Sequence, residues 1–204
     1  RYTHQSRYFE ISDAWTLAQK LDNYVRWPHD GSWQTIDGDG CIEVWFFPTK
    51  LLDNRTIFRK EARDLKSGGY LLRINEDGSL YFSVSGAEGQ SGFAISSPIN
   101  FVSMLNWHHV AVTKQGNVCR LYLDGDKIGE KISTADWTGD GFFSLGRNDL
   151  DDNNPLTHDF FKGYMYDLRV TRGRAKYDGE TYSLPSSLED ELVDTTPQAV
   201  DFLS

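Results

Sequence analysis

The residues with the clearest capacity for chemistry form an acidic, amide-rich stretch near residue 150. The sequence Asn148-Asp149-Leu150-Asp151-Asp152-Asn153-Asn154-Pro155, followed by Asp159, concentrates carboxylate and amide oxygens in one expected loop. Calcium takes about six to eight oxygen ligands, so this loop can hold Ca²⁺ through Asp149, Asp151, Asp152 and Asp159. The stretch lacks the DxDxDG order and the terminal Glu of an EF-hand, and Asp and Asn are also ordinary turn residues. A calcium site and a plain polar turn are therefore both open.

Aromatic side chains in or near expected loops are a second candidate group. Proteins hold sugars by stacking an exposed aromatic ring on the sugar face while polar side chains fix the hydroxyl groups. The predicted ligand-binding residues are Trp33, Tyr81, Trp137, Asn153 and Asn154. Partly buried packing is the competing interpretation of each ring.

Motifs for enzymatic chemistry are missing from the sequence. Gly89-Gln90-Ser91-Gly92 lacks the spacing of a GxSxG nucleophile elbow, and HExxH, the P-loop and GxGxxG do not occur. Retaining glycoside hydrolysis needs two carboxylates about 5 Å apart. Glu43 stands alone in its strand-like segment, and Glu189-Asp190-Glu191 lies in the C-terminal tail. We therefore do not expect an enzyme.

The charge balance and the cysteines narrow the partners and the chemistry further. The chain carries 21 Lys+Arg against 30 Asp+Glu, for a net charge of −9. Nucleic-acid binding depends on cationic side chains, so a nucleic-acid partner is not expected. No run of about 18 apolar residues is present, so membrane insertion is not expected either. Cys41 and Cys119 both lie in strand-like runs, which favours two buried thiols over one disulfide bond.

The elements that position these residues are short apolar segments separated by Gly, Asp and Asn clusters, a pattern typical of antiparallel β-sheets. A short helix is expected only after Asp13, where Ala14, Leu17, Ala18 and Leu21 recur at helical spacing. The Asp77-Gly78 and Asp124-Gly125 pairs suit tight hairpin turns. The expected strands are residues 41–47, 70–74, 80–84, 110–114, 118–123, 127–131, 142–145 and 161–170.

Three segments carry a family resemblance. GCIEVWFFP (40–48), NWHHVAVT (106–113) with LYLDG (121–125), and FKGYMYDLRVTRGRAKY (161–177) resemble the early strand, central hairpin and closing segment of laminin G-like domains. These domains form part of the concanavalin A-like lectin–glucanase superfamily. The closing segment is similar to the form found in phage virion and bacterial surface proteins. The resemblance implies an all-β, antiparallel two-sheet jelly-roll sandwich over residues 1–182, with residues 183–204 as an acidic arm or linker.

The same resemblance implies a non-catalytic carbohydrate-binding or adhesion module, as a structural protein of a virion such as a phage fibre or decoration. The alternatives are a purely structural assembly module without glycan binding and, less in keeping with the motifs, a glycoside hydrolase. The implied partners are a cell-surface glycan or other virion proteins, and a homo-oligomer is open. The implied location is a virion or the extracellular space. Calcium occurs in many related domains, which favours the Ca²⁺ interpretation of the loop near residue 150.

Four residues of the resembling segments have predicted structural roles. Trp45 and Trp107 are large rings at strand positions and are expected between the two sheets. His108 and His109 are neighbours in one strand, so their side chains are expected on opposite faces and cannot converge on one metal.

Overall fold

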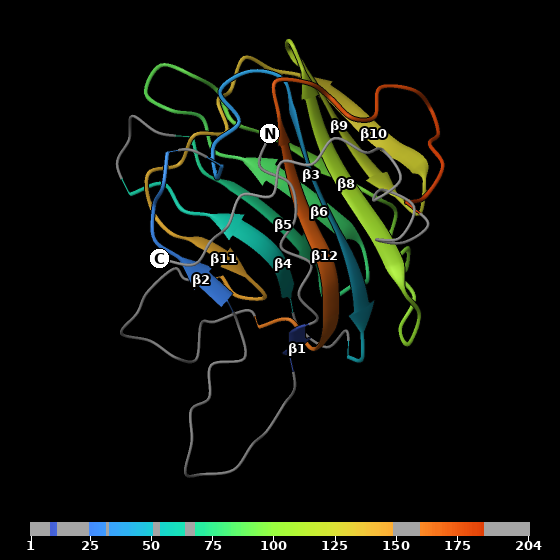
Figure 1. Ribbon diagram of the computed structural model, residues 1–204. Helices are drawn as coiled ribbons and strands as arrows, with labels where there is room; N and C mark the ends of the chain where they lie inside the picture. Colours follow the sequence, from blue (N-terminus) through green and yellow to red (C-terminus); the bar gives the residue numbers. More distant parts are fainter. Residues whose placement is uncertain are drawn as a thin grey trace, which may run out of the picture.

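The computed structural model describes residues 9–11, 25–31, 33–50, 54–63, 68–148 and 160–185. These residues form β-strands, turns and loops, and none of them is helical. The strands pair antiparallel throughout and make two sheets that pack face to face, as Figure 1 shows with β12, β3 and β8 lying over β4, β5 and β6. The predicted antiparallel two-sheet sandwich is confirmed.

Each sheet has six strands. The order in the first sheet is β1 (Phe9–Ile11), β12 (Gly163–Arg172), β3 (Gly40–Pro48), β8 (His108–Gln115), β9 (Val118–Leu123) and β10 (Asp126–Ile132). The order in the second sheet is β2 (Val25–Trp27), β11 (Phe143–Leu145), β4 (Arg55–Lys60), β5 (Tyr70–Ile74), β6 (Leu80–Val84) and β7 (Phe93–Ser96). Strands β12, β3 and β8 therefore form the centre of the first sheet.

The tight hairpins form where the turn residues predict them. Asp124 and Gly125 connect β9 to β10 and have φ angles of 53° and 93°. Positive φ at both central positions suits the right-handed twist of a two-residue hairpin, and Asp and Gly accept it at low cost. Gly78 has a φ of 74° and closes the turn between β5 and β6. These local signals explain why both hairpins could be predicted.

The core lies between the sheets and follows the two-residue period of the strands. In β3, Ile42, Val44 and Phe46 are fully buried and point inward. Phe58 and Phe82 oppose them from the second sheet, and both are fully buried. The residues that alternate with these on β3 lie on the outer face of the first sheet, where the candidate site is found.

Strand β12 changes its face part-way along. A bulge between Tyr166 and Arg169 includes Asp167, whose φ of 56° is unusual for a non-glycine residue. Before the bulge Met165 points into the core, and after it Leu168 and Val170 pack against the core. The bulge therefore brings the side chain of Arg169 to the outer face, opposite Glu43.

Several expectations are corrected by the structure. Strands β1, β2, β4 and β7 were not predicted from the sequence. Trp45 and Trp107 do not lie between the sheets, because the inward positions around them belong to Val44, Phe46 and His108; Trp107 is 42 % exposed. Cys41 and Cys119 are free and buried, as expected. The expected helix after Asp13 and most of the C-terminal arm lie outside the described residues, and the division at residue 182 stays a prediction.

Candidate functional site

Five aromatic side chains form a strip on the outer face of the first sheet, and we call them the aromatic strip. They are Trp45 and Phe47 of β3, Trp107 immediately before β8, and Tyr164 and Tyr166 of β12. The strand register places Phe47 beside Tyr164 and Trp45 beside Tyr166. The ring centroid of Phe47 lies 5.6 Å from that of Trp107 and 5.9 Å from that of Tyr164. All five rings are partly or largely exposed.

The position of the strip follows from alternation along three adjacent strands. Its members occupy every second position, and the residues between them, such as Phe46 and Met165, are fully buried in the core. Gly163 also shapes this region, because a Cβ atom at that position would lie 1.9 Å from the carbonyl oxygen of Phe47. The glycine permits the close approach of β12 to β3 that brings Tyr164 beside Phe47.

The other half of the same face carries a buried polar cluster, which we call the capped cluster. It consists of Glu43, His109, Arg169, Lys176 and Tyr182. Lys176 Nζ donates to Glu43 Oε1 over 2.7 Å, and Arg169 Nη1 lies 3.9 Å from the same oxygen. The Tyr182 hydroxyl oxygen lies 2.6 Å from His109 Nδ1. The side chains of Glu43 and His109 are each only 1 % exposed.

Residues 173–185, which follow β12, cover this cluster and are drawn in red in Figure 1. The backbone N–H of Tyr182 donates to the Gly125 carbonyl over 2.8 Å, and the Tyr122 hydroxyl donates to the Gly179 carbonyl over 2.9 Å. The rings of Tyr177 and Tyr182 stack with centroids 3.7 Å apart. The segment is therefore held against the sheet by both backbone and side-chain contacts.

The capped cluster keeps its histidine and tyrosine uncharged. Burial, together with the positive charges of Lys176 and Arg169, lowers the pKa of His109 to about 3. Burial and the nearby Glu43 carboxylate raise the pKa of Tyr182 well above its usual range. His109 is neutral near pH 7, so its 3.9 Å approach to Glu43 is not an ion pair. The Tyr182 hydroxyl can then donate to Nδ1, which leaves the ring hydrogen on Nε2, towards Glu43.

The carboxylates of this face are engaged by cations. Asp167 Oδ1 accepts from Arg169 Nε over 2.9 Å, and a second contact joins Asp167 Oδ2 to Arg169 Nη2. The side chain of Asp167 is 3 % exposed. Hydrolysis of a glycoside requires a pair of carboxylates that reach the substrate. Glu43 and Asp167 are instead buried and paired with cationic side chains, and these pairs hold β3, β12 and residues 173–185 together.

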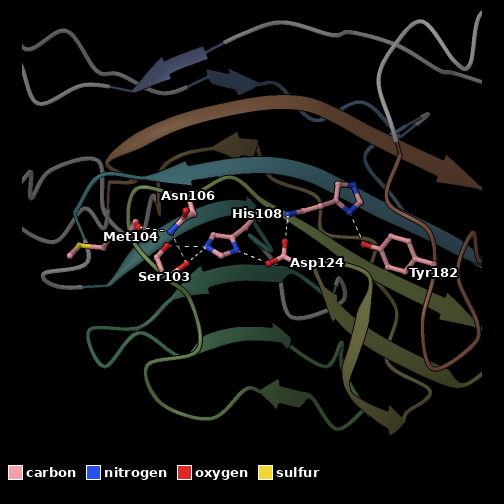
Figure 2. Close-up of polar contacts among 7 residues, drawn as sticks. Ser103, Met104, Asn106, His108, Asp124 and Tyr182 are labelled. Carbon is pink, nitrogen blue, oxygen red and sulfur yellow. Dashed lines mark hydrogen bonds and ion pairs between the residues drawn. The ribbon is translucent and has the colours of Figure 1, made fainter.

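His108 lies on the opposite face of β8 and forms a separate network, shown in Figure 2. Its Nδ1 lies 2.7 Å from Asp124 Oδ2, and its Nε2 lies 2.9 Å from the Ser103 carbonyl oxygen and 3.0 Å from Ser103 Oγ. Both ring nitrogens thus face acceptors, as in an imidazolium that donates twice. Nε2 then carries a hydrogen, so the Ser–His–Asp order does not activate the serine hydroxyl. The prediction that His108 and His109 point to opposite faces is confirmed.

The charge state of His108 follows from two opposing effects. Burial of the ring lowers its pKa, whereas the hydrogen bonds to Asp124 and to the Ser103 carbonyl, with the Asp124 charge, raise it by more. The pKa of His108 is therefore raised above its ordinary value. Asp124 also accepts a hydrogen bond from the His109 backbone N–H over 2.8 Å. The histidine thus ties the loop at Ser103 to the hairpin at Asp124.

The decisive comparison is with protein families. The family model described as the concanavalin A-like lectin/glucanases superfamily matches residues 19–175. The chain belongs to this superfamily. A comparison with curated proteins finds no match.

Several solved structures share the fold of this chain at low sequence identity. The mouse laminin α1 chain domains LG4-5 superpose with a TM-score of 0.59 and 16 % identity, over 90 % of this chain and 47 % of that one. Domain 4 of the Geobacillus stearothermophilus arabinanase AbnA, in complex with arabinotriose, superposes with a TM-score of 0.55 and 20 % identity, over 74 % of this chain and 67 % of that one. The Ruminococcus gnavus sialidase CBM40, bound to α2,3-sialyllactose, superposes with a TM-score of 0.53 and 15 % identity, over 66 % of this chain and 76 % of that one. These likenesses establish the fold alone.

The superfamily fold places the predicted ligand-binding aromatics apart from one another. Trp137 is fully buried and lies 5.0 Å from the Phe82 ring, so it cannot stack on a sugar, and the prediction for this residue is wrong. Trp33 is partly buried, with its ring centroid 5.5 Å from that of Trp27. Tyr81 is partly exposed on the second sheet, with the Arg73 guanidinium 4.9 Å above its ring. The structure does not bring these three residues together.

The predicted calcium ligands Asp149, Asp151, Asp152 and Asp159, and the predicted amides Asn153 and Asn154, lie outside the described residues. Calcium binding at this loop therefore stays a prediction. In the part of the chain that the structure describes, no group of three or more His, Cys, Asp or Glu side chains is placed to hold a metal ion. Across the same part, no helix has the length and apolarity needed to cross a membrane.

The aromatic strip was missed although a signal for it was present. Val110 and Val112 mark the inward positions of β8, so a strict two-residue period assigns Trp107 and His109 to the outer face. The same period around Val44 and Phe46 assigns Trp45 to that face. Trp45 and Trp107 were instead expected in the core because of their size.

Proposed function

We propose that this chain is a non-catalytic carbohydrate-binding module whose binding surface is the aromatic strip. A strip of partly exposed rings offers apolar faces on which sugar rings can stack. The single observation that carries the proposal is the grouping of Trp107, Phe47 and Tyr164 on one face, with centroid separations of 5.6 and 5.9 Å. Spacings of this size let neighbouring sugar units contact neighbouring rings.

The superfamily membership supports a carbohydrate ligand. Two of the solved structures that share the fold carry glycans, arabinotriose in one and α2,3-sialyllactose in the other. The aromatic strip consists of this chain's own side chains, so it supports the proposal independently of those structures. The burial and pairing of Glu43 and Asp167 support the non-catalytic part, because neither carboxylate is placed to protonate or attack a glycosidic bond.

We propose further that the module is displayed on a virion or another extracellular surface, and that Ca²⁺ bound near Asp149 and Asp159 contributes to glycan recognition. The family resemblance of the closing segment, residues 161–177, supports the virion setting. The oxygen-rich composition of residues 148–159 supports calcium. Removal of calcium with EDTA tests this part, since a calcium-dependent site loses glycan affinity and regains it when Ca²⁺ is added.

A glycan array, followed by calorimetry with the best-bound oligosaccharide, tests the binding surface. Trp107→Ala and Phe47→Ala each remove one ring of the strip, and we expect each to weaken binding at least tenfold, about 1.4 kcal/mol. Tyr81→Ala is the matched control, because Tyr81 is a partly exposed ring on the other sheet. We expect its affinity to equal that of the unaltered chain.

Three outcomes would count against the proposal. Loss of affinity on Tyr81→Ala but not on Trp107→Ala would move the site to the second sheet. Release of reducing sugars from a polysaccharide would show an enzyme. Absence of binding to any glycan, with and without Ca²⁺, would leave the purely structural assembly role as the interpretation.

A further inference from the structure

Three rings of the aromatic strip form a row that crosses three neighbouring strands, and we call it the ring row. It consists of Tyr164 of β12, Phe47 of β3 and Trp107 immediately before β8, in the order in which these strands lie side by side in Figure 1. The Phe47 ring centroid lies 5.9 Å from that of Tyr164 and 5.6 Å from that of Trp107. A glycan that contacts all three rings must match the direction, the spacing and the tilt of this row.

The direction follows from where the outer face is open. Along β3, the side chains on this face come from every second residue, in the order Phe47, Trp45 and Glu43. Glu43 is 1 % exposed beneath residues 173–185, so a glycan laid along β3 contacts two rings before this segment blocks it. Across the strands, the ring row offers three rings. A glycan that uses the full row therefore runs perpendicular to β3.

The spacing of the ring row matches an extended chain of sugars. Centroid separations of 5.6 Å and 5.9 Å are close to the full length of one pyranose unit. Bonds between opposite equatorial positions, such as the β-1,4 bonds of xylan and cellulose, keep a chain nearly straight and advance it by almost a full unit at each step. Chains with α-1,4 bonds coil and advance by less. A β-1,4-linked chain can therefore place one sugar on each ring.

The tilt between the rings selects the twist of that chain. The plane of the Phe47 ring makes an angle of 56° with Trp107 and of 60° with Tyr164. A sugar that stacks on a ring lies parallel to it, so successive sugar planes must be inclined by the same angles. A flat ribbon with two units per turn keeps its sugar planes parallel. A helix with three units per turn rotates each sugar by a third of a turn, which inclines successive planes by 60°, as in the ring row.

We propose that the ring row binds a soluble β-1,4-linked glycan in a helix of three units per turn, of the kind that xylan forms, and holds three successive sugars. This ligand class rests on the glycan-binding function proposed above. Xylose carries no hydroxymethyl group, so both faces of each unit are open to an aromatic ring. The rings are fixed on adjacent strands before binding, which lowers the entropy cost of ordering the site. Crystalline cellulose presents flat, parallel sugars and cannot stack on all three rings.

Calorimetry of the full chain with xylose oligomers of increasing length tests this ligand class. We expect the affinity to rise about tenfold from xylobiose to xylotriose, as the third ring is engaged, and to rise little beyond xylotetraose. Tyr164→Ala should remove the gain from the third sugar, so that xylotriose binds no better than xylobiose. Tyr164→Phe is the matched control, because it keeps the ring and should keep the gain. Cellotriose should bind more weakly than xylotriose, and crystalline cellulose should retain no protein.

The results that would overturn the ligand class differ from those that would overturn the proposed function. Equal affinities for xylobiose and xylotetraose, or retention of the protein by crystalline cellulose, would overturn the ligand class. Loss of the third-sugar gain in Tyr164→Phe would assign that gain to the hydroxyl group and would overturn the stacking arrangement. Binding of another glycan through Trp107, without binding of xylotriose, would overturn the ligand class while the proposed function stands. Absence of binding to any glycan would overturn both.

Discussion

The outer face of the first sheet is built in two different ways along its length. Around Glu43 and His109, side chains that are 1 % exposed are buried beneath residues 173–185. Around Phe47 and Trp107, aromatic rings are left partly open, and Trp107 is 42 % exposed. The same three strands, β3, β8 and β12, run through both halves.

The comparison shows how each half balances its burial. Buried polar groups destabilise a fold unless each finds a partner, and residues 173–185 supply Lys176 and Tyr182 as partners to the capped cluster. The aromatic strip needs fewer buried partners, because its rings are partly or largely exposed; within it, Phe47 packs on Trp107 and Tyr164. One half thus contributes stability through paired charges, and the other keeps apolar surface available for a ligand.

Removal of Arg169 should break the capped half and have the largest effect on stability. Its guanidinium contacts both Asp167 and Glu43, and loss of one member of a buried charge group leaves the others uncompensated. We expect Arg169→Ala to lower the free energy of unfolding by about 3 to 5 kcal/mol in urea titrations at neutral pH. The matched control is Arg172→Ala, where a more exposed arginine contacts Asp37 over 2.8 Å.

Arg172→Ala should lower the free energy of unfolding by less than about 1 kcal/mol, because exposed ion pairs contribute little to stability. Equal losses for Arg169→Ala and Arg172→Ala would mean that the capped cluster contributes no more than a surface pair. The contrast between the two halves would then rest on exposure alone. Glycan affinity of folded Arg169→Ala protein should be retained, because Arg169 is not part of the strip.

Acidification should destabilise the chain through His109 of the capped cluster. The pKa of His109 is about 3 in the folded chain and about 6.5 when unfolded, so below about pH 6.5 only the unfolded chain binds the proton. This group therefore lowers stability as the pH falls, by about 1.4 kcal/mol per pH unit between about pH 6 and pH 4. His109→Gln should lack this contribution. Urea midpoints measured for both chains across this range would refute the assignment if their slopes coincide.

The sequence predicted those parts of the sandwich whose signals are local. Asp124-Gly125 and Gly78 mark hairpins whose geometry depends on a few adjacent residues, and the strands around them were found with nearly the observed bounds. Strand β4 was missed because its sequence, RTIFRK, is mostly polar. Arg55 and Lys60 are nevertheless buried there. Nothing local indicates that the surroundings of β4 can bury two cations.

The candidate site was less predictable because it depends on long-range packing. The bulge at Asp167 exchanges the faces of β12, so alternation read through it assigns Arg169 to the wrong side. The contact of Lys176 with Glu43 joins segments far apart in the sequence. Trp107, in contrast, could have been placed from the inward positions of Val110 and Val112. The error there lay in expecting every large ring in the core.

The adjacent residues His108 and His109 differ in the charge of their surroundings, and we expect this difference to have the smallest of the effects. His109, among the cations of the capped cluster, is held neutral, whereas His108, between Asp124 and the Ser103 carbonyl, has a raised pKa. The stabilisation from His108 is therefore complete below its unfolded pKa of about 6.5 and is lost as the pH rises through the folded value.

Titration of the two imidazoles by NMR tests this assignment. We expect the His108 ring to titrate above about 6.5 in the folded chain, while His109 remains neutral throughout the same range. Asp124→Asn should bring the His108 pKa down, because the amide keeps an acceptor for the His109 N–H but removes the negative charge beside Nδ1. A His108 ring that titrates below its ordinary value, or that does not respond to Asp124→Asn, would show that burial outweighs its two acceptors. The link from the Asp124 hairpin to the loop at Ser103 would then be a hydrogen bond of the neutral ring near pH 7.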